Sequence, residues 1–108
     1  MSVLDIQGRL RECSDIVGKT PRLNDLLHNA EFVVNKMKQV FSLFKEPSLA
    51  LVLNLLSTIL QGDENIIRIL KEECGEDLIS DDAVFPFLLL YCSFITFTEY
   101  IKIQTGQP

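Results

Sequence analysis

The sequence has few of the residues that catalytic and metal sites require. It contains one histidine, His28, and three cysteines, Cys13, Cys74 and Cys92, none of them in a CxxC spacing. Nucleophilic catalysis needs a serine or cysteine near a base, and a zinc site needs four nitrogen or sulfur ligands at short spacings. We therefore expect a protein that is not an enzyme and that has no catalytic residue, metal ligand or cofactor. The single histidine is expected to be exposed or bonded at a helix end.

The cysteines are also too few and too scattered for the paired framework of a small secreted protein, and buried free thiols are expected. The first residues, MSVLDIQGRLR, mix acids, bases and apolar residues, and they lack the apolar segment of a signal peptide. These two absences predict a cytoplasmic or nuclear location, or both.

Basic surface and glycine-rich loops are missing as well. Residues 1–54 carry seven bases and six acids, whereas residues 55–108 carry three bases and nine acids. A chain of net charge −5 without a basic stripe is not expected to bind nucleic acid. Isolated glycines at turns form no phosphate-binding loop.

An acidic segment, EECGEDLISDD at residues 72–82, has six acids and no base. It lacks the alternating ligands and central glycine of a calcium loop. A solvated loop at residues 76–82 is expected, and the alternative is a surface for a basic partner segment.

Apolar residues recur at helical spacing through most of the chain. Residues 3–17 predict a helix with a capping box from Ser2 to Asp5 and a left-handed stop at Gly18. Thr20 is expected to cap a second start at Pro21. Residues 21–44 form either one helix or two that join near residues 28–30. Further helices are predicted from Pro47 to residue 61, where apolar residues occur all round, and over residues 64–74.

The last apolar run extends from Ala83 to Thr98, sixteen residues without a charge. A membrane-spanning helix needs about 20 apolar residues, so a packed core helix is the first expectation and a membrane anchor the alternative. Residues 104–108 are expected to fray.

The two halves of the sequence overlay when the chain is shifted by 43 positions. A self-match at about 40 residues is typical of helical repeat units. The chance overlap of two amphipathic helices is the alternative explanation. The matched pairs are Leu10 with Leu53, Cys13 with Leu56, Ser14 with Ser57, Ile16 with Ile59, Val17 with Leu60, Leu23 with Ile66, Leu26 with Ile69, and Leu27 with Leu70.

Residues 54–78 resemble the armadillo repeat, in which a long helix ends in a Leu-Ser-x-Leu-type run before Gly-Asp, Glu-Asn, a short helix and a Gly. The matching residues are Leu56, Ser57, Ile59, Gly62, Asp63, Glu64, Asn65, Ile69 and Gly75. The resemblance implies an all-α fold in a single domain, 1–108. It would be a right-handed superhelical stack of about two repeats, 3–45 and 47–98, with an atypical apolar C-terminal helix.

The resemblance also implies a groove that binds a protein or peptide partner. The family's Trp and Asn positions fall on Asn54 and Thr58, and on Arg11 and Asp15 in the earlier copy; Gln61 ends the same stripe. The expected function is a non-enzymatic interaction module, a scaffold or adaptor, that uses this groove or an exposed helix face. Two alternatives are a small membrane-associated protein anchored by residues 83–98 and a death-fold-like bundle that self-associates.

Overall fold

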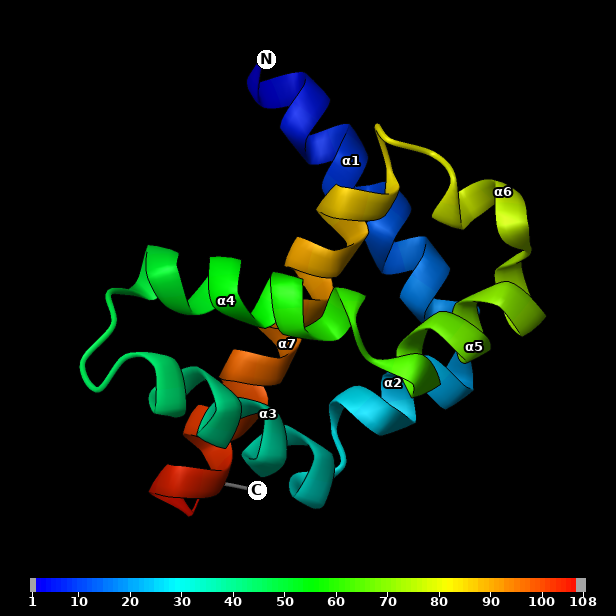
Figure 1. Ribbon diagram of the computed structural model, residues 1–108. Helices are drawn as coiled ribbons and strands as arrows, with labels where there is room; N and C mark the ends of the chain where they lie inside the picture. Colours follow the sequence, from blue (N-terminus) through cyan, green and yellow to red (C-terminus); the bar gives the residue numbers. More distant parts are fainter. Residues whose placement is uncertain (1, 107–108) are drawn as a thin grey trace.

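The computed structural model describes residues 2–106, except for the side chain of Leu4, and within this range the chain forms seven helices and no strand (Figure 1). The predicted all-α class is confirmed. The helices are α1 (Val3–Gly18), α2 (Pro21–Leu27), α3 (Ala30–Leu43), α4 (Leu49–Gln61), α5 (Glu64–Cys74), α6 (Glu76–Ile79) and α7 (Phe85–Thr105).

The start of α1 follows the prediction, and its end does not. Ser2 and Asp5 form the predicted capping box. Gly18, however, is the last residue of the helix and has no left-handed conformation; among the described residues only Gly75 and Gly106 have positive φ. The amide of Lys19 donates to the carbonyl of Asp15 at 3.0 Å, so the helix closes without a left-handed residue.

Of the two alternatives for residues 21–44, the structure has two helices that join near residues 28–30. His28 ends α2, and the side chain of Asn29 accepts a hydrogen bond from the amide of Phe32 at 2.9 Å. An asparagine cap of this kind satisfies an amide that has no partner within the helix. The sequence Leu27-His28-Asn29 therefore contains both the end of one helix and the start of the next.

Two predicted helix starts are wrong in detail. The hydroxyl of Thr20 makes no capping bond to α2, because it donates instead to the carbonyl of Ile16 at 2.6 Å. Helix α4 begins at Leu49, not at Pro47, and the side chain of Ser48 accepts from the amide of Leu51 at 3.2 Å. In both cases a hydroxyl can reach more than one nearby backbone group, and the apolar spacing does not predict which hydrogen bond forms.

The prediction of a loop at residues 76–82 is wrong in part, because helix α6 occupies residues 76–79. Its Leu78 and Ile79 are half-buried against the core. Asp81 closes the turn that leads into α7, since its carboxylate accepts from the amides of Ala83 and Val84. At the other end of α7, residues 104–105 are helical, contrary to the predicted fraying, and residues 107–108 lie outside the described range.

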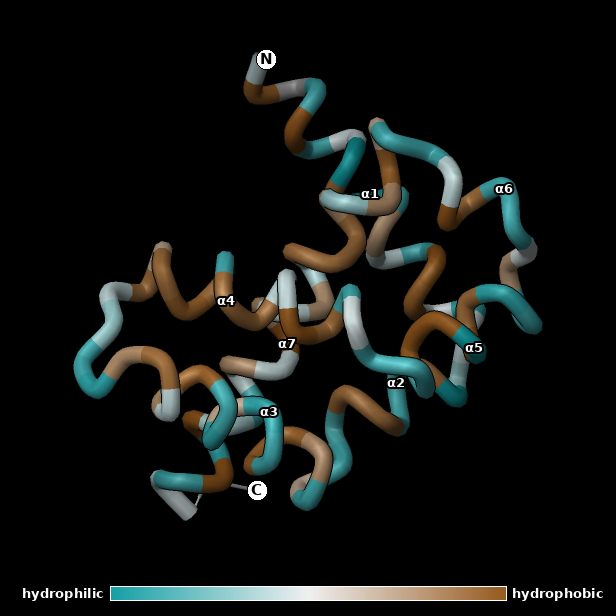
Figure 2. The backbone as a smooth tube through the Cα atoms, in the orientation of Figure 1, coloured by the Kyte–Doolittle hydropathy of each residue, from teal (hydrophilic) through white to brown (hydrophobic). Residues whose placement is uncertain are grey.

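Helix α7 runs through the middle of the molecule and contacts α1, α2, α3 and α4 (Figure 1). Figure 2 shows hydrophobic residues along most of its length. The hydroxyls of its buried Ser93 and Thr96 donate to the carbonyls of Leu89 and Cys92, each at 2.8 Å, so neither is left without a partner. Its buried residues are Phe85, Leu88, Leu89, Cys92, Ser93 and Thr96.

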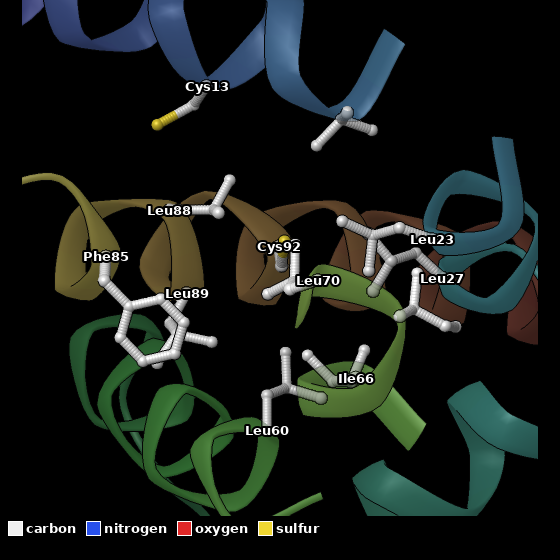
Figure 3. Packing of buried hydrophobic residues seen from close by; sticks show 12 residues of the cluster. Cys13, Leu23, Leu27, Leu60, Ile66, Leu70, Phe85, Leu88, Leu89 and Cys92 are labelled. Atoms are coloured by element: carbon white, nitrogen blue, oxygen red, sulfur yellow. The ribbon is translucent and has the colours of Figure 1, made fainter. Parts of the chain in front are cut away.

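The core has two parts, divided along α7. The larger part joins α1, α2, α5, the end of α4 and the first half of α7, as Figure 3 shows for Leu23, Ile66 and Leu88. The smaller part joins α3 and α4 to the second half of α7 through Met37, Leu56 and the half-buried Phe97.

By length and composition, α7 is also the one helix among the described residues that could cross a membrane. A mostly buried core helix meets the same criterion; α7 has four helices packed against it, and 28% of its apolar 18-residue window is buried.

Candidate functional site

The two stretches that the 43-residue shift aligns bury several of their matched residues. Val17 and Leu60 lie in the larger core cluster, as do Leu23 and its counterpart Ile66. Leu27 and Leu70, the last matched pair, are both fully buried. Each half is a helix, a short turn and a second helix: α1 and α4 both pack on α7, while α2 packs against α5. The 43-residue shift therefore matches positions with similar burial.

Leu10 and Leu53, the first matched pair, line one apolar hollow of about 360 Å³. It lies where α1, α4 and the first half of α7 converge (Figure 1). Leu10 is 42% exposed and Phe94 is 55% exposed, so large hydrophobic side chains face solvent here. The full lining is Leu10, Leu53, Phe87, Leu90, Tyr91 and Phe94. We call this surface the apolar hollow.

The residues predicted to form a peptide groove are all exposed, on two helices. Arg11 and Asp15 line a shallow hollow along α1, and that hollow does not include the predicted residues of α4. On α4, the hydroxyl of Thr58 donates to the carbonyl of Asn54 at 3.1 Å. The exposure of Asn54 excludes a buried, purely structural amide at this position. Gln61 is the last residue of α4 and is exposed.

Arg11 and Asn54 directly follow Leu10 and Leu53 in the sequence. The hydrophobic residue before each of these two predicted groove residues therefore lines the apolar hollow. The sequence analysis did not identify this hollow. Its lining residues come from three helices, and α7 contributes four of the six. The helical spacing of Phe87, Leu90, Tyr91 and Phe94 is the signal that could have indicated a shared face.

A buried ion pair joins α3 to the α4–α5 turn, and the sequence analysis missed it. The Nζ of Lys36 lies 2.6 Å from Oδ2 of Asp63, and the two side chains are only 11% and 9% exposed. Lys36 also lies over the ring of Phe32, 5.1 Å from its centroid. The signal in the sequence is the position of Lys36 among apolar residues at helical spacing, with Val33, Met37 and Val40.

Asp63 has a second role, because its other oxygen accepts from the amide of Ile66 at 3.0 Å and caps α5. Burial by itself raises the pKa of Asp63, but the hydrogen bonds from Lys36 and from the Ile66 amide outweigh it. The pKa of Asp63 is therefore held below its usual value. The carboxylate stays charged and fixes the turn between α4 and α5.

The acidic segment is partly neutralised by α2. Arg22 forms ion pairs with Glu72 and Glu73, at 2.7 and 3.1 Å. Further along the same α2–α5 boundary, the hydroxyl of Thr20 lies 3.6 Å from the sulfur of Cys74. Part of the acidic segment is therefore paired within the protein.

Of the residues considered for catalysis or metal binding, only Cys13 and Cys92 share one part of the core. Cys13 and Cys92 are buried, Cys74 is exposed, and among the described residues no three His, Cys, Asp or Glu side chains gather as metal ligands. His28 is exposed at the end of α2, where its Nδ1 donates to the carbonyl of Asn24 at 2.8 Å. This is the cap-bonded position expected for a structural histidine.

Comparison with known proteins assigns no family to the chain. No family model, curated protein or solved structure matches it. What the molecule does must therefore be inferred from its own surface, on which the apolar hollow and the exposed residues next to it are the first features to consider.

Proposed function

We propose that the protein is a non-enzymatic interaction module, a scaffold or adaptor, that holds an amphipathic helix of a partner protein in the apolar hollow. The observation that carries this proposal is the hollow itself, lined by six large hydrophobic side chains from three helices. Partner helices commonly insert apolar side chains from successive turns into such a groove. Its volume of about 360 Å³ accommodates one or two large side chains.

The groove residues predicted from the sequence fit this proposal as a rim. Interfaces usually have an apolar centre and a polar edge. Arg11 and Asn54 are exposed and directly follow two lining residues. They supply hydrogen bonds to the partner's backbone or polar face, while Leu53 and Phe94 make the apolar contacts.

The proposal includes an armadillo-like arrangement of the two halves. It is supported by the equivalent burial of Val17 and Leu60, and by Leu10 and Leu53 lining one hollow. In a helical repeat each unit buries its apolar face on a neighbour. Here α7 is the shared neighbour of α1 and α4. This atypical apolar helix closes the stack.

Site-specific photo-crosslinking in cells tests the proposal. A benzophenone side chain is placed at position 94, inside the hollow, and in separate chains at position 54 on the rim and at position 77 on the exposed part of α6. We expect a discrete crosslinked protein from position 94, the same protein more weakly from position 54, and none from position 77.

The matched variant is Leu10→Glu, which puts a charge into the hollow at a residue already 42% exposed, so the fold tolerates it. This change should remove the crosslink from position 94 while circular dichroism stays helical. An identical pattern from all three positions, or a crosslink that survives Leu10→Glu, would overturn the proposal. A crosslink to a second copy of the chain would favour self-association instead.

Membrane anchoring by residues 83–98 is the second candidate, favoured by the length and composition of α7. Against it stands the packing of α7 on four other helices. Alkaline carbonate treatment of cell membranes separates the two. Release of the full chain into the supernatant would exclude a spanning α7, whereas retention in the pellet would favour it.

A further inference from the structure

A second exposed apolar surface lies at the opposite end of α7, at the corner between α3 and α4. Leu43 is 60% exposed, Leu49 55% and Phe44 51%. Figure 2 shows hydrophobic segments on both sides of the short hydrophilic turn that joins these helices. We call the following residues the α3–α4 corner: Phe41, Leu43, Phe44, Leu49 and Ile101, with the lysines Lys38, Lys45 and Lys102.

The end of α7 belongs to this corner because the rings of Phe41 and Tyr100 pack together, with centroids 6.1 Å apart. Ile101, the next residue, is 44% exposed. Figure 1 shows the end of α3, the start of α4 and the end of α7 on one side of the molecule, and these three segments carry five exposed hydrophobic residues. No helix among the described residues covers them.

The charge of this corner is opposite to that of the whole chain. Lys38, Lys45 and Lys102 are exposed, and each lies one helical turn from, or next to, an exposed hydrophobic residue. Glu46 is the only acid between residues 32 and 62. With Glu99 on α7 counted beside Lys102, the corner carries three exposed lysines and two acids, a small positive excess on a chain with net charge −5.

From this combination we propose that the α3–α4 corner docks on an anionic lipid surface. Apolar side chains that protrude between lysines can enter the interfacial region of a bilayer while the ammonium groups meet lipid phosphates and carboxylates. The ring of Tyr100 lies beside Phe41, and aromatic residues of this kind favour the membrane interface. The acidic segment at the α5–α6 end would be repelled by such a surface, so the charge distribution also orients the molecule.

This docking is peripheral and leaves α7 packed in the core. It is independent of the apolar hollow, which is lined by different residues. If the chain fails to bind vesicles, partner binding in the apolar hollow can still be measured, and the reverse also holds.

Co-sedimentation of the full chain with vesicles tests the proposal. Vesicles of equal parts phosphatidylserine and phosphatidylcholine should bind the protein, and vesicles of phosphatidylcholine alone should bind it far more weakly. Lys38→Gln with Lys45→Gln should weaken binding by about 30-fold, since each lysine near an anionic surface contributes about a factor of five. Leu43→Ser with Phe44→Ser should abolish sedimentation.

The matched controls alter exposed residues of the same types elsewhere. Val3→Ser with Ile6→Ser, and Lys19→Gln with Arg68→Gln, should leave vesicle binding unchanged. The proposal is overturned if the chain binds neither vesicle, if it binds both equally, or if the controls lose as much binding as the corner variants. Binding to an acidic peptide without binding to vesicles would overturn it as well, and would assign the corner to a protein partner.

Discussion

Lys36 on α3 and Asp63 at the start of α5 form the least exposed ion pair of the described residues, with Nζ and Oδ2 2.6 Å apart. It ties α3 to the α4–α5 turn, two segments 27 positions apart in the chain. The same carboxylate caps α5 through the amide of Ile66. One aspartate therefore fixes both a helix start and the packing of a helix from the earlier half of the chain.

We predict that Asp63→Asn lowers the free energy of unfolding by about 3 kcal/mol, because removing one partner leaves a buried charge uncompensated. Lys36→Met removes that charge, so the double variant should be less destabilised than the sum of the single variants. Urea unfolding followed by circular dichroism measures all four proteins of this cycle.

The exposed pair of Arg22 with Glu72 is the control for this prediction. Glu72→Gln should change stability much less than Asp63→Asn, because solvent screens a pair at the surface. Equal effects of the two substitutions would show that the Lys36–Asp63 pair has no special part in holding the fold.

Acid should weaken the protein through the same residue. The pKa of Asp63 is lower in the folded chain than in the unfolded chain, so its contribution is present above the unfolded value of about 3.9. It is lost as the pH falls through the folded pKa, because the unfolded chain takes up the proton first. Unfolding free energies measured from neutral pH down to about pH 2 should fall more steeply below about pH 4 for the natural chain than for Asp63→Asn. Parallel curves would contradict this role.

Much of the local structure could be predicted from the sequence. The break at His28-Asn29 and the end of α5 at Gly75 depend on residues whose backbone preferences act locally. The Lys36–Asp63 pair could not be predicted from the sequence, because α3 and the α4–α5 turn meet only in the folded chain. The sequence also did not reveal that the Thr20 hydroxyl bonds to the carbonyl of Ile16, four residues earlier, or that residues 76–79 form a helix whose Leu78 and Ile79 pack on the core.

The candidate site was predicted less well than the helices. Arg11 and Asn54 were predicted from their positions in the armadillo resemblance. The structure shows that their hydrophobic neighbours, Leu10 and Leu53, line the apolar hollow. The hollow exists because α7 lies against both α1 and α4, and the 43-residue shift does not include α7. The packing of α7 against α1 and α4 depends on tertiary structure, and neither of the two aligned stretches predicts it.

The cysteines should differ sharply in reactivity. Burial raises the pKa of Cys13 from 9.0 to about 11, and burial raises that of Cys92 to about 12, whereas Cys74 is exposed. The thiolate is the reactive form, so a shift of this size reduces the reactive fraction of Cys13 about a hundredfold. A thiol reagent such as DTNB should modify one thiol quickly in the folded protein and all three in urea. Cys74→Ser should remove the fast phase; a fast phase that remains would show that the core around α7 is open.

Shortening the buried side chain at either of two matched positions should destabilise the protein by a similar amount. Leu27 and Leu70 are both fully buried, and removal of a buried leucine side chain costs about 2–5 kcal/mol. We expect Leu27→Ala and Leu70→Ala each to lower unfolding free energy within this range. Val3→Ala, at a residue 70% exposed, should change it by no more than about 0.5 kcal/mol. A large loss at only one of the two leucines would argue against equivalent roles for the two halves.

The most direct test of this account is hydrogen exchange of the backbone amides of α7 in the full chain, without lipid or detergent. If α7 is the inner helix on which α1 to α4 pack, the amides of residues 89–96 should be among the slowest to exchange, and should exchange only with global unfolding. Rapid exchange of these amides in a chain that remains helical elsewhere, with protection only after detergent is added, would contradict the account and assign α7 to a membrane.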